Sequence, residues 1–322
     1  MNAATAHGKN DTRQYPQNLG LPEFAALFGC AVADLPEDCV KIITSRNFRY
    51  RVAEGRERDE ILLGVLKKID SGVLSVAGQD RLSAWEKGWG ENLDAFSKSG
   101  DISQLVPKYV RPGQPLRLNQ QYIVTEDSDF EIHWYSAFRL WLFRTYLKNA
   151  SSIYEFGCGS GYNLPVLAHL FPDKKIWGLD WAVPSVDIVN KMAQVYKWKM
   201  EGRRFDFFQP DKNFKLDPAG TVLTIGALEQ TGDNYGAFID YLVASKPALV
   251  VNIEPTVEWY DENDLVDYAA ARFHRQRRYW EGFLEKLAAL EKKGRVKTVK
   301  TKRSFFGSLF VEGYSQIIWK PV

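Results

Sequence analysis

The residues best suited to chemistry lie in a glycine-rich run at 154–163, which reads YEFGCGSGYN. The run follows the short apolar stretch 152–156, where a strand should turn into a helix. A glycine-rich turn at the carboxyl end of a strand lets a ligand approach bare backbone, and open α/β sheets bind ligands in the crevice outside those strand ends. The dinucleotide fingerprint would begin at Gly157 and needs a third glycine where Tyr162 stands. The run therefore predicts a ligand loop, and Tyr162 weakens the prediction of a pyrophosphate ligand.

Three further side chains could transfer protons. His274 falls on a predicted long helix, 265–292, one position off its apolar stripe and one turn before Arg278. Glu229 and Glu254 each follow a short apolar run, where a carboxylate could reach a substrate at the ligand edge of a sheet. A general base must lie within hydrogen-bond reach of the proton that it removes. Each has an alternative role, as a half-exposed helix histidine or as a carboxylate that caps the following helix.

The loop has the form acidic-x-G-x-G-x-G. Together with the alternating pattern after residue 150, it resembles motif I of the class I S-adenosylmethionine-dependent methyltransferases, and the resemblance covers about residues 151–322. The resemblance implies that the loop passes under the methionine part of the cofactor and that the acidic residue leading it helps to fix the amino group. The implied cofactor-binding positions in the loop are Glu155, Gly157, Cys158, Gly159, Gly161 and Asn163.

The same resemblance implies cofactor contacts further along the chain. Asp180 ends the second apolar run, 25 residues after Glu155, and would accept hydrogen bonds from both ribose hydroxyls, although it could also cap the next helix. Trp181 would pack against adenine or be an ordinary core aromatic, and Asp211 would lie near the adenine amino group. The segment GALEQ matches motif IV beneath the transferable methyl and contributes Gly226 and Leu228.

No metal site is expected. Asp233 and Asn234 stand where metal-dependent small-molecule methyltransferases cluster their ligands, but such residues more often start a helix. The three cysteines, Cys30, Cys39 and Cys158, lack CxxC spacing. They therefore predict neither a zinc site nor a disulfide framework, and a reducing cytoplasm is the expected location.

The elements that must position these residues begin near residue 151. Short apolar runs alternate with helices, which predicts a parallel sheet with helices on both faces. The five runs are 152–156, 176–179, 205–208, 222–225 and 249–253. Two last strands, 297–306 and 316–320, should pair antiparallel. The expected fold is thus a doubly wound, seven-stranded, mostly parallel sheet whose last strand is antiparallel, as in the family that the sequence resembles.

The N-terminal part should consist of a flexible leader, 1–20, and a mainly helical cap domain, 21–150. Apolar residues at helical spacing predict helices at 57–70 and 131–147. Between them, the segment 107–122 carries three prolines and is expected to form an extended loop rather than a strand. The cap would cover the sheet edge and supply an acceptor pocket with Trp85, Trp89, Trp134 and Tyr135.

Composition narrows the class of protein. The chain has 322 residues, of which 45% are apolar and 25% charged, as in folded globular proteins. No run approaches the roughly 18 apolar residues of a membrane-spanning helix, so no membrane association is expected. The net charge is only +2, but 272–303 carries 12 Lys or Arg against three Asp or Glu. That segment is either the solvated side of an amphipathic helix or a surface for an anionic partner.

The predicted function is methyl transfer from S-adenosylmethionine to a hydroxyl of a small polar acceptor, which could be anionic, such as a sugar or sugar nucleotide. A looser resemblance, carried by GALEQ and the tail RSFFGSLFVEGYSQIIWKP, is to bacterial sugar and surface-glycan methyltransferases. The alternatives are N-methylation of an amine or amino sugar, which needs no essential base, an RNA methyltransferase, and a cofactor-binding protein without catalysis. Nucleic acid is not an expected partner, because no RNP-type aromatic signature is present. A homo-oligomer is compatible with the sequence.

Overall fold

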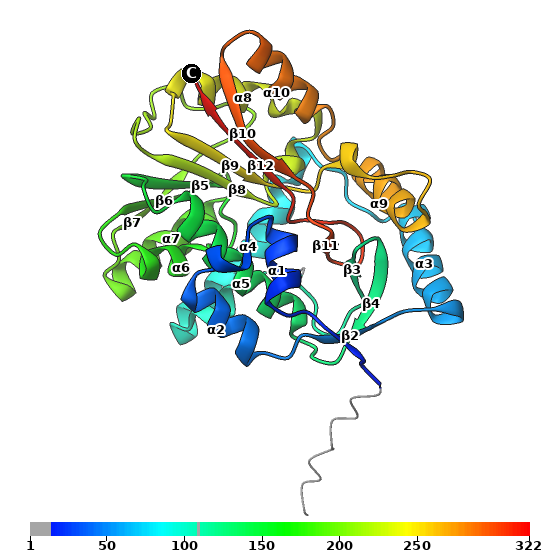
Figure 1. The fold of residues 1–322 in the computed structure, drawn as a ribbon. Coiled ribbons are helices and arrows are strands. Elements are labelled where there is room, and N and C mark those ends of the chain that lie inside the picture. The colour runs from blue at the N-terminus through cyan, green and yellow to red at the C-terminus, as the bar shows by residue number, and fades with distance from the viewer. Residues whose placement is uncertain (1–13, 108–109) are drawn as a thin grey trace, which may run out of the picture.

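The structure, a computed structural model, describes residues 14–107 and 110–322, so most of the predicted leader, 1–13, lies outside the described residues. Its central element is a seven-stranded sheet with the strand order β10-β12-β9-β8-β5-β6-β7 (Figure 1). In chain order these strands are β5 (Ser152–Phe156), β6 (Lys175–Asp180), β7 (Met200–Arg204), β8 (Thr221–Ile225), β9 (Leu249–Ile253), β10 (Val296–Lys302) and β12 (Gln316–Pro321). The strands from β7 to β9 are parallel, whereas β12 runs antiparallel to β9 and to β10. The predicted sheet with its antiparallel last strand is confirmed.

Helices cover both faces of this sheet because successive strand residues point to opposite sides. On β5, Ile153 belongs to one apolar core, whereas Tyr154 and Phe156 belong to another. The first core includes residues of α5 (Phe130–Tyr146), α6 (Leu164–Leu170) and α7 (Val183–Tyr196), and the second those of α8 (Gly236–Ser245) and α10 (Phe283–Lys292). This doubly wound arrangement brings the carboxyl ends of β5, β6 and β8 to one edge.

The predicted third strand, 205–208, is wrong. The strand is β7, at Met200–Arg204, on the edge of the sheet, and most of its side chains are exposed. An edge strand of this kind lacks a continuous apolar run, so the pattern pointed to the aromatic segment that follows it. The N–H of Phe205 donates a hydrogen bond to the Asp180 carbonyl at 2.8 Å, and the chain then leaves the sheet.

The predicted long helix, 265–292, is in fact two helices, α9 (Leu265–Gln276) and α10. The chain breaks between them at Arg278, with φ 49°, and Gly282, with φ 72°. Both angles lie in the left-handed region, which an α-helix does not use. Trp280, inside the break, is fully buried, and its indole donates a hydrogen bond to the Pro255 carbonyl at 2.7 Å. Because the buried Trp280 continues the apolar stripe of α9, the sequence pattern predicted one uninterrupted helix.

The N-terminal part is not wholly helical, because it contains most of a second sheet with the order β1-β2-β4-β3-β11. These strands are β1 (Gln17–Asn18), β2 (Arg49–Val52), β3 (Leu116–Leu118), β4 (Gln121–Thr125) and β11 (Phe306–Gly307). The prediction of an extended loop at 107–122 is therefore wrong for its last third, where β3 and β4 form a hairpin. Its prolines precede β3, and Asn119 and Gln120 make the turn with φ 49° and 60°. The predicted strand 297–306, the last but one, is likewise divided into β10 and β11, so the two predicted domains share this second sheet.

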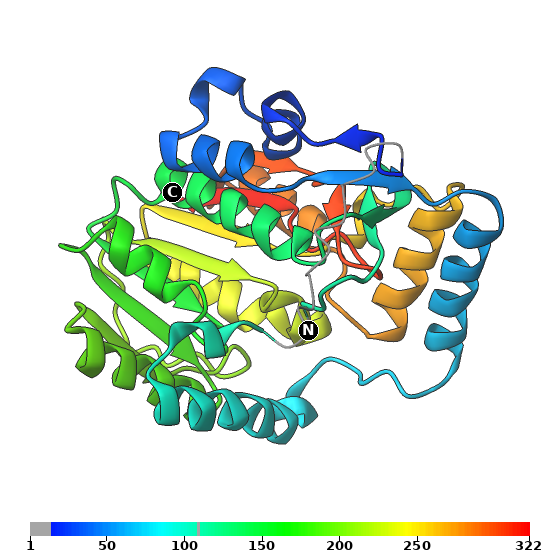
Figure 2. The ribbon, with the colours of Figure 1, turned by 90° about the horizontal axis from the view of Figure 1, so that it is seen from below.

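The remaining helices form the rest of the cap. They are α1 (Leu21–Phe28), α2 (Glu37–Ser45), α3 (Gly55–Asp70) and α4 (Leu82–Ser99), with short 3-10 helices η1 (Val32–Asp34), η2 (Gln79–Arg81), η3 (Ile102–Leu105), η4 (Leu228–Tyr235) and η5 (Val257–Trp259). Both predicted cap helices, at 57–70 and 131–147, are confirmed as α3 and α5. Figure 2 shows α3 beside α9, while the segment after α3 crosses the molecule to α4, which packs on α7. Among the described residues, no helix combines the length and apolar character needed to cross a membrane.

Candidate functional site

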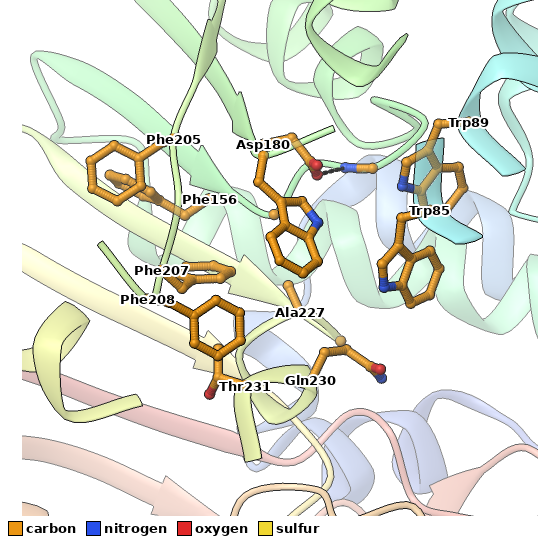
Figure 3. Close-up of a pocket in the computed structure, with 14 residues that line it drawn as sticks. Trp85, Trp89, Phe156, Asp180, Phe205, Phe207, Phe208, Ala227, Gln230 and Thr231 are labelled. Carbon is orange, nitrogen blue, oxygen red and sulfur yellow. Dashed lines mark hydrogen bonds between the residues drawn. The ribbon is translucent and has the colours of Figure 1, made fainter. Parts of the chain in front are cut away.

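A pocket opens at the carboxyl ends of β5, β6 and β8, and α4 closes one side of it (Figure 3). Its lining is mostly aromatic and backbone, with three polar side chains. The lining residues are Trp85, Trp89, Phe156, Gly157, Gly159, Asp180, Trp181, Phe205, Phe207, Phe208, Gly226, Ala227, Gln230 and Thr231. The two α4 tryptophans face the phenylalanines across the pocket, with Asp180 between them. Small-molecule sites are typically concave and apolar with a few placed polar groups, and this pocket has that character.

The glycine run after β5 forms one wall of the pocket. Gly157 has φ 70° and Gly159 has φ 55°, in the left-handed region that side chains other than glycine rarely adopt. A Cβ at Gly157 would overlap the Cβ of Ala227, and one at Gly159 would lie 2.9 Å from the indole of Trp89. The glycines are therefore required for both the turn and the close approach of neighbouring groups.

Asp180 supplies the carboxylate of the pocket at the end of β6. Its side chain is 5% exposed, and it accepts hydrogen bonds from the N–H groups of Gly159 and Ala182, each at 2.9 Å. Burial raises the pKa of Asp180 to about 6, and the backbone hydrogen bonds offset part of that effect. Asp180 thus ties the glycine loop to the start of α7, as the expected helix cap would, and it also lines the pocket.

Glu155 lies beside the loop but does not line the pocket, because its neighbour Phe156 takes the pocket side of the strand. One carboxylate oxygen, Oε1, accepts a hydrogen bond from Asn163 Nδ2 at 2.7 Å, and Asn163 Oδ1 accepts one from the Tyr135 hydroxyl at 2.8 Å. The other oxygen, Oε2, is buried without a hydrogen-bond partner among the described residues. Burial raises the pKa of Glu155 to about 7. An unpartnered buried carboxylate oxygen is costly and is suited to accept from a cationic group.

Of the other residues that the resemblance implied, some line the pocket and others do not. Trp181 and Gly226 line the pocket, whereas Cys158 and Leu228 are buried and do not line it. Asp211 does not line it either, since it is exposed and pairs with Arg203 at 3.0 Å. The expected place of Asp211 depended on a third strand at 205–208. Because β7 ends earlier, phenylalanines of the segment after it occupy that side of the pocket.

His274 is not brought to the pocket. It is fully buried on α9, and its Nε2 lies 2.7 Å from the carbonyl of Trp280, which can only accept, so Nε2 carries the proton. Burial lowers the pKa of His274 to about 4. The ring holds the break between α9 and α10 in place. This placement, fully buried and outside the pocket lining, does not support the predicted role of His274 as a general base.

Glu254 and Glu229 are also buried outside the pocket lining. The Glu254 carboxylate accepts hydrogen bonds from the N–H groups of Ala227 at 3.0 Å and Leu228 at 3.2 Å, so it caps the turn that begins η4. Glu229 Oε1 accepts a hydrogen bond from Gln230 Nε2 at 2.7 Å. Burial, followed by the neighbouring Glu229, raises the pKa of Glu254. Glu254 therefore caps an earlier helix, η4, and not the helix that follows it, which was the alternative stated for both glutamates.

Several lining residues were not singled out from the sequence. Trp85 and Trp89 were expected in the pocket as part of the cap, and they stack with ring centroids 5.4 Å apart. Trp134 and Tyr135, which had been grouped with them, are buried instead in the core behind the sheet. The unexpected members are Phe156, Phe205, Phe207, Phe208 and Thr231, whereas Ala227 and Gln230 belong to the GALEQ segment that was expected at the cofactor. The aromatic cluster FDFFQ was a signal for three of them, but it was assigned to a strand.

Comparisons place the chain beside several solved structures of low identity. No protein family model and no curated protein matches the sequence. The methyltransferase domain of bacterial CtHen1-CN is 18% identical with a TM-score of 0.40, over 57% of this chain and 95% of that chain. A SAM-dependent methyltransferase from Aquifex aeolicus is 15% identical with a TM-score of 0.38, over 56% of this chain and 87% of that chain. The plantazolicin methyltransferase BpumL, in complex with a monoazolic desmethylPZN analog and SAH, is 13% identical with a TM-score of 0.43, over 76% of this chain and 98% of that chain. Likeness at this level does not identify a substrate or a reaction.

Proposed function

We propose that this chain is an S-adenosylmethionine-dependent methyltransferase and that the pocket beneath α4 is its cofactor site. The observation that carries the proposal is the buried Asp180 carboxylate, which lines the pocket beside the bare backbone of Gly157 and Gly159. A carboxylate at the end of the second strand can accept both hydroxyls of a ribose. The predicted fold, with the loop at the carboxyl end of the first strand of the large sheet, supports the same proposal.

The groups in and beside the pocket fit the chemistry of that cofactor. Trp181 and the phenylalanines provide apolar rings for an adenine. Outside the lining but beside the loop, Glu155 Oε2, which has no hydrogen-bond partner among the described residues, is an acceptor that an ammonium reaching past the loop would satisfy. Trp89 lies against Gly159 and screens the loop from water. The cofactor, when bound, supplies a methyl group already activated on a sulfonium. The protein therefore has mainly to bind, orient and exclude water.

The placement of the ionisable groups bears on the acceptor. A hydroxyl acceptor needs its proton removed by a side chain within reach, and neither His274 nor the two glutamates line the pocket. Of the lining residues, only Asp180 is ionisable, and it is engaged by two backbone N–H groups. This supports an amine or amino sugar, whose free base attacks unaided, over a hydroxyl of a sugar as the methyl acceptor. We place the reaction in the cytoplasm as part of the same proposal.

A transfer assay with labelled S-adenosylmethionine tests the proposal. Glucosamine and glucose form a matched pair that differs in the nucleophile, and a nucleotide sugar and a short RNA complete the panel. Label should appear in the amine and not in its hydroxyl counterpart. Transfer to glucose alone would restore the hydroxyl acceptor, and absence of cofactor binding by calorimetry would overturn the methyltransferase itself.

A further inference from the structure

Two arginines from distant parts of the chain, Arg81 and Arg277, lie close enough for their charges to interact, and neither belongs to the pocket lining itself. The segment between α3 and α4 crosses the molecule and ends at Arg81 (Figure 2). It is held there by backbone hydrogen bonds from Ala77 N to the Arg277 carbonyl at 2.7 Å and from Gly78 N to the Gln230 carbonyl at 2.9 Å. Gln230 lines the pocket. These bonds join the segment that carries Arg81 to the backbone of Arg277 and of a pocket residue.

Aromatic rings hold both guanidinium groups. Arg81 Cζ lies 5.1 Å from the ring centroid of Trp85, which lines the pocket, and Arg277 Cζ lies 5.0 Å from that of Tyr279. A guanidinium stacked on a ring keeps its planar fork of donors in a fixed orientation. The Nε atom of each arginine is buried and has no hydrogen-bond partner among the described residues. Each therefore has donor capacity that the protein leaves unused.

Among the described residues, no carboxylate forms an ion pair with either arginine of this pair, whereas Arg272 and Arg275 on α9 pair with Asp70 and Glu262, each at 2.7 Å. Burial, and after it the positive charge of Arg277, lowers the pKa of the Arg81 guanidinium. Two like charges held together and partly out of water destabilise the folded protein unless an anion joins them.

We propose that Arg81 and Arg277 bind an anionic group, a phosphate or a carboxylate, of the methyl acceptor at the Gln230 end of the pocket. This inference rests on the proposed function, because only a methyltransferase has a methyl acceptor. It adds the chemical class of that acceptor, an anionic molecule. Arginine forks bind oxyanions through paired, charge-assisted hydrogen bonds. An acceptor anchored there by its anionic end would extend toward the glycine loop along the surface formed by Trp85 and Gln230.

The test uses the full chain saturated with S-adenosylhomocysteine and three probes, inorganic phosphate, glucuronate and uncharged glucose, at constant ionic strength. The variants are Arg81→Gln and Arg277→Gln. The matched control is Arg278→Gln, which removes the same charge from an exposed neighbour. Calorimetry should show phosphate or glucuronate binding to the wild type and the control, no binding of glucose, and a loss of anion affinity of about tenfold or more in each of the two variants. Preference for phosphate over glucuronate, or the reverse, identifies which oxyanion the site takes.

Thermal unfolding separates this role from a structural one. Without added anion, Arg81→Gln and Arg277→Gln should melt no lower than the wild type, because each removes a repulsion. Equal anion affinity in all four proteins would overturn the proposal, and so would a lower melting temperature of both variants without anion. Tight binding of a short RNA that depends on both arginines would overturn the small acceptor in favour of a nucleic acid. Failure of the wild type to bind S-adenosylhomocysteine would count against the proposed function and not against the anion site.

Discussion

Three carboxylates lie buried at the carboxyl ends of β5, β6 and β9, and their hydrogen-bond partners differ. Asp180 and Glu254 accept from backbone N–H groups, whereas Glu155 keeps one oxygen without a partner among the described residues. The sequence could predict that these positions carry carboxylates at a ligand edge. It could not predict which of them caps a turn, because that depends on the path of the following loop. Sequence spacing also placed His274 near the edge without revealing its burial.

His274 should prove to be a positioning residue, with an effect on stability that depends on pH. Burial lowers its pKa to about 4 from an ordinary 6.5, so the unfolded chain binds more protons than the folded one below pH 6.5. Its contribution to stability is therefore complete above pH 6.5 and is lost as the pH falls toward 4. Between pH 7 and pH 5 the free energy of unfolding should fall by about 2 kcal/mol from this group.

Urea unfolding of the wild type and His274→Gln at both pH values measures this effect. The variant should be less stable at pH 7 and should lose less stability on acidification. Its turnover per folded molecule should stay within about threefold of the wild type. A loss of 10²-fold or more with intact stability, on the order expected for a general base, would return His274 to a catalytic role.

At the scale of elements, strands that are buried on both faces were predicted from the sequence, whereas an edge strand and the break in a helix were not. The strands β5 and β9 were predicted with their observed bounds because both are continuous apolar runs. The exposed edge strand β7 gave no such run. The prolines before the β3–β4 hairpin led to the prediction of a loop there. The buried Trp280 continues the apolar stripe beyond α9, so the end of that helix was not predicted. These failures involve tertiary context, which local periodicity does not contain.

The turn between β5 and α6 leads to a prediction about ligand binding. Gly159→Val would place a β-branched side chain at φ 55° and against the Trp89 indole, so it would distort the pocket wall that these two residues form. Binding of S-adenosylmethionine should be lost in calorimetry. Gly236→Val is the matched control, because Gly236 starts α8 with open space around its Cα and should leave affinity unchanged. Circular dichroism must show both variants folded, and normal affinity in folded Gly159→Val would remove the loop from the cofactor site.

At the scale of the whole molecule, the basic segment 272–303 does not act as one charged face. Arg272, Arg275 and Arg303 pair with carboxylates from other parts of the chain, and the Lys300 ammonium donates to the carbonyls of Phe28 and Gly29. Folding thus distributes a charge excess that is conspicuous in the sequence. Sequence counting alone could not identify these partners, since three of them, Asp70, Phe28 and Gly29, lie about 200 or more residues away along the chain.

This distribution predicts a weak response of catalysis to salt. Between 50 and 200 mM salt, the affinity of a protein that makes six to ten phosphate contacts with DNA falls by about 10³ to 10⁵, whereas a small anion held by two arginines should lose less than about tenfold. Steady-state methyl transfer to the best acceptor in the panel, measured as kcat/KM at both concentrations, provides the comparison. A steep loss would favour an extended polyanion as substrate and would contradict a small acceptor.

The central claim is that S-adenosylmethionine binds at Asp180, and calorimetric titration of the wild type, Asp180→Asn and Asp211→Asn tests it most directly. Asp180→Asn should weaken binding by at least about tenfold, because hydrogen bonds to a charged group contribute roughly 1.5 to 3 kcal/mol each. Asp211 carries a carboxylate that is 40% exposed and lies outside the pocket lining, so the Asp211→Asn variant should bind like the wild type. Unchanged affinity in a folded Asp180→Asn, or tighter binding of NAD than of S-adenosylmethionine by the wild type, would contradict the account.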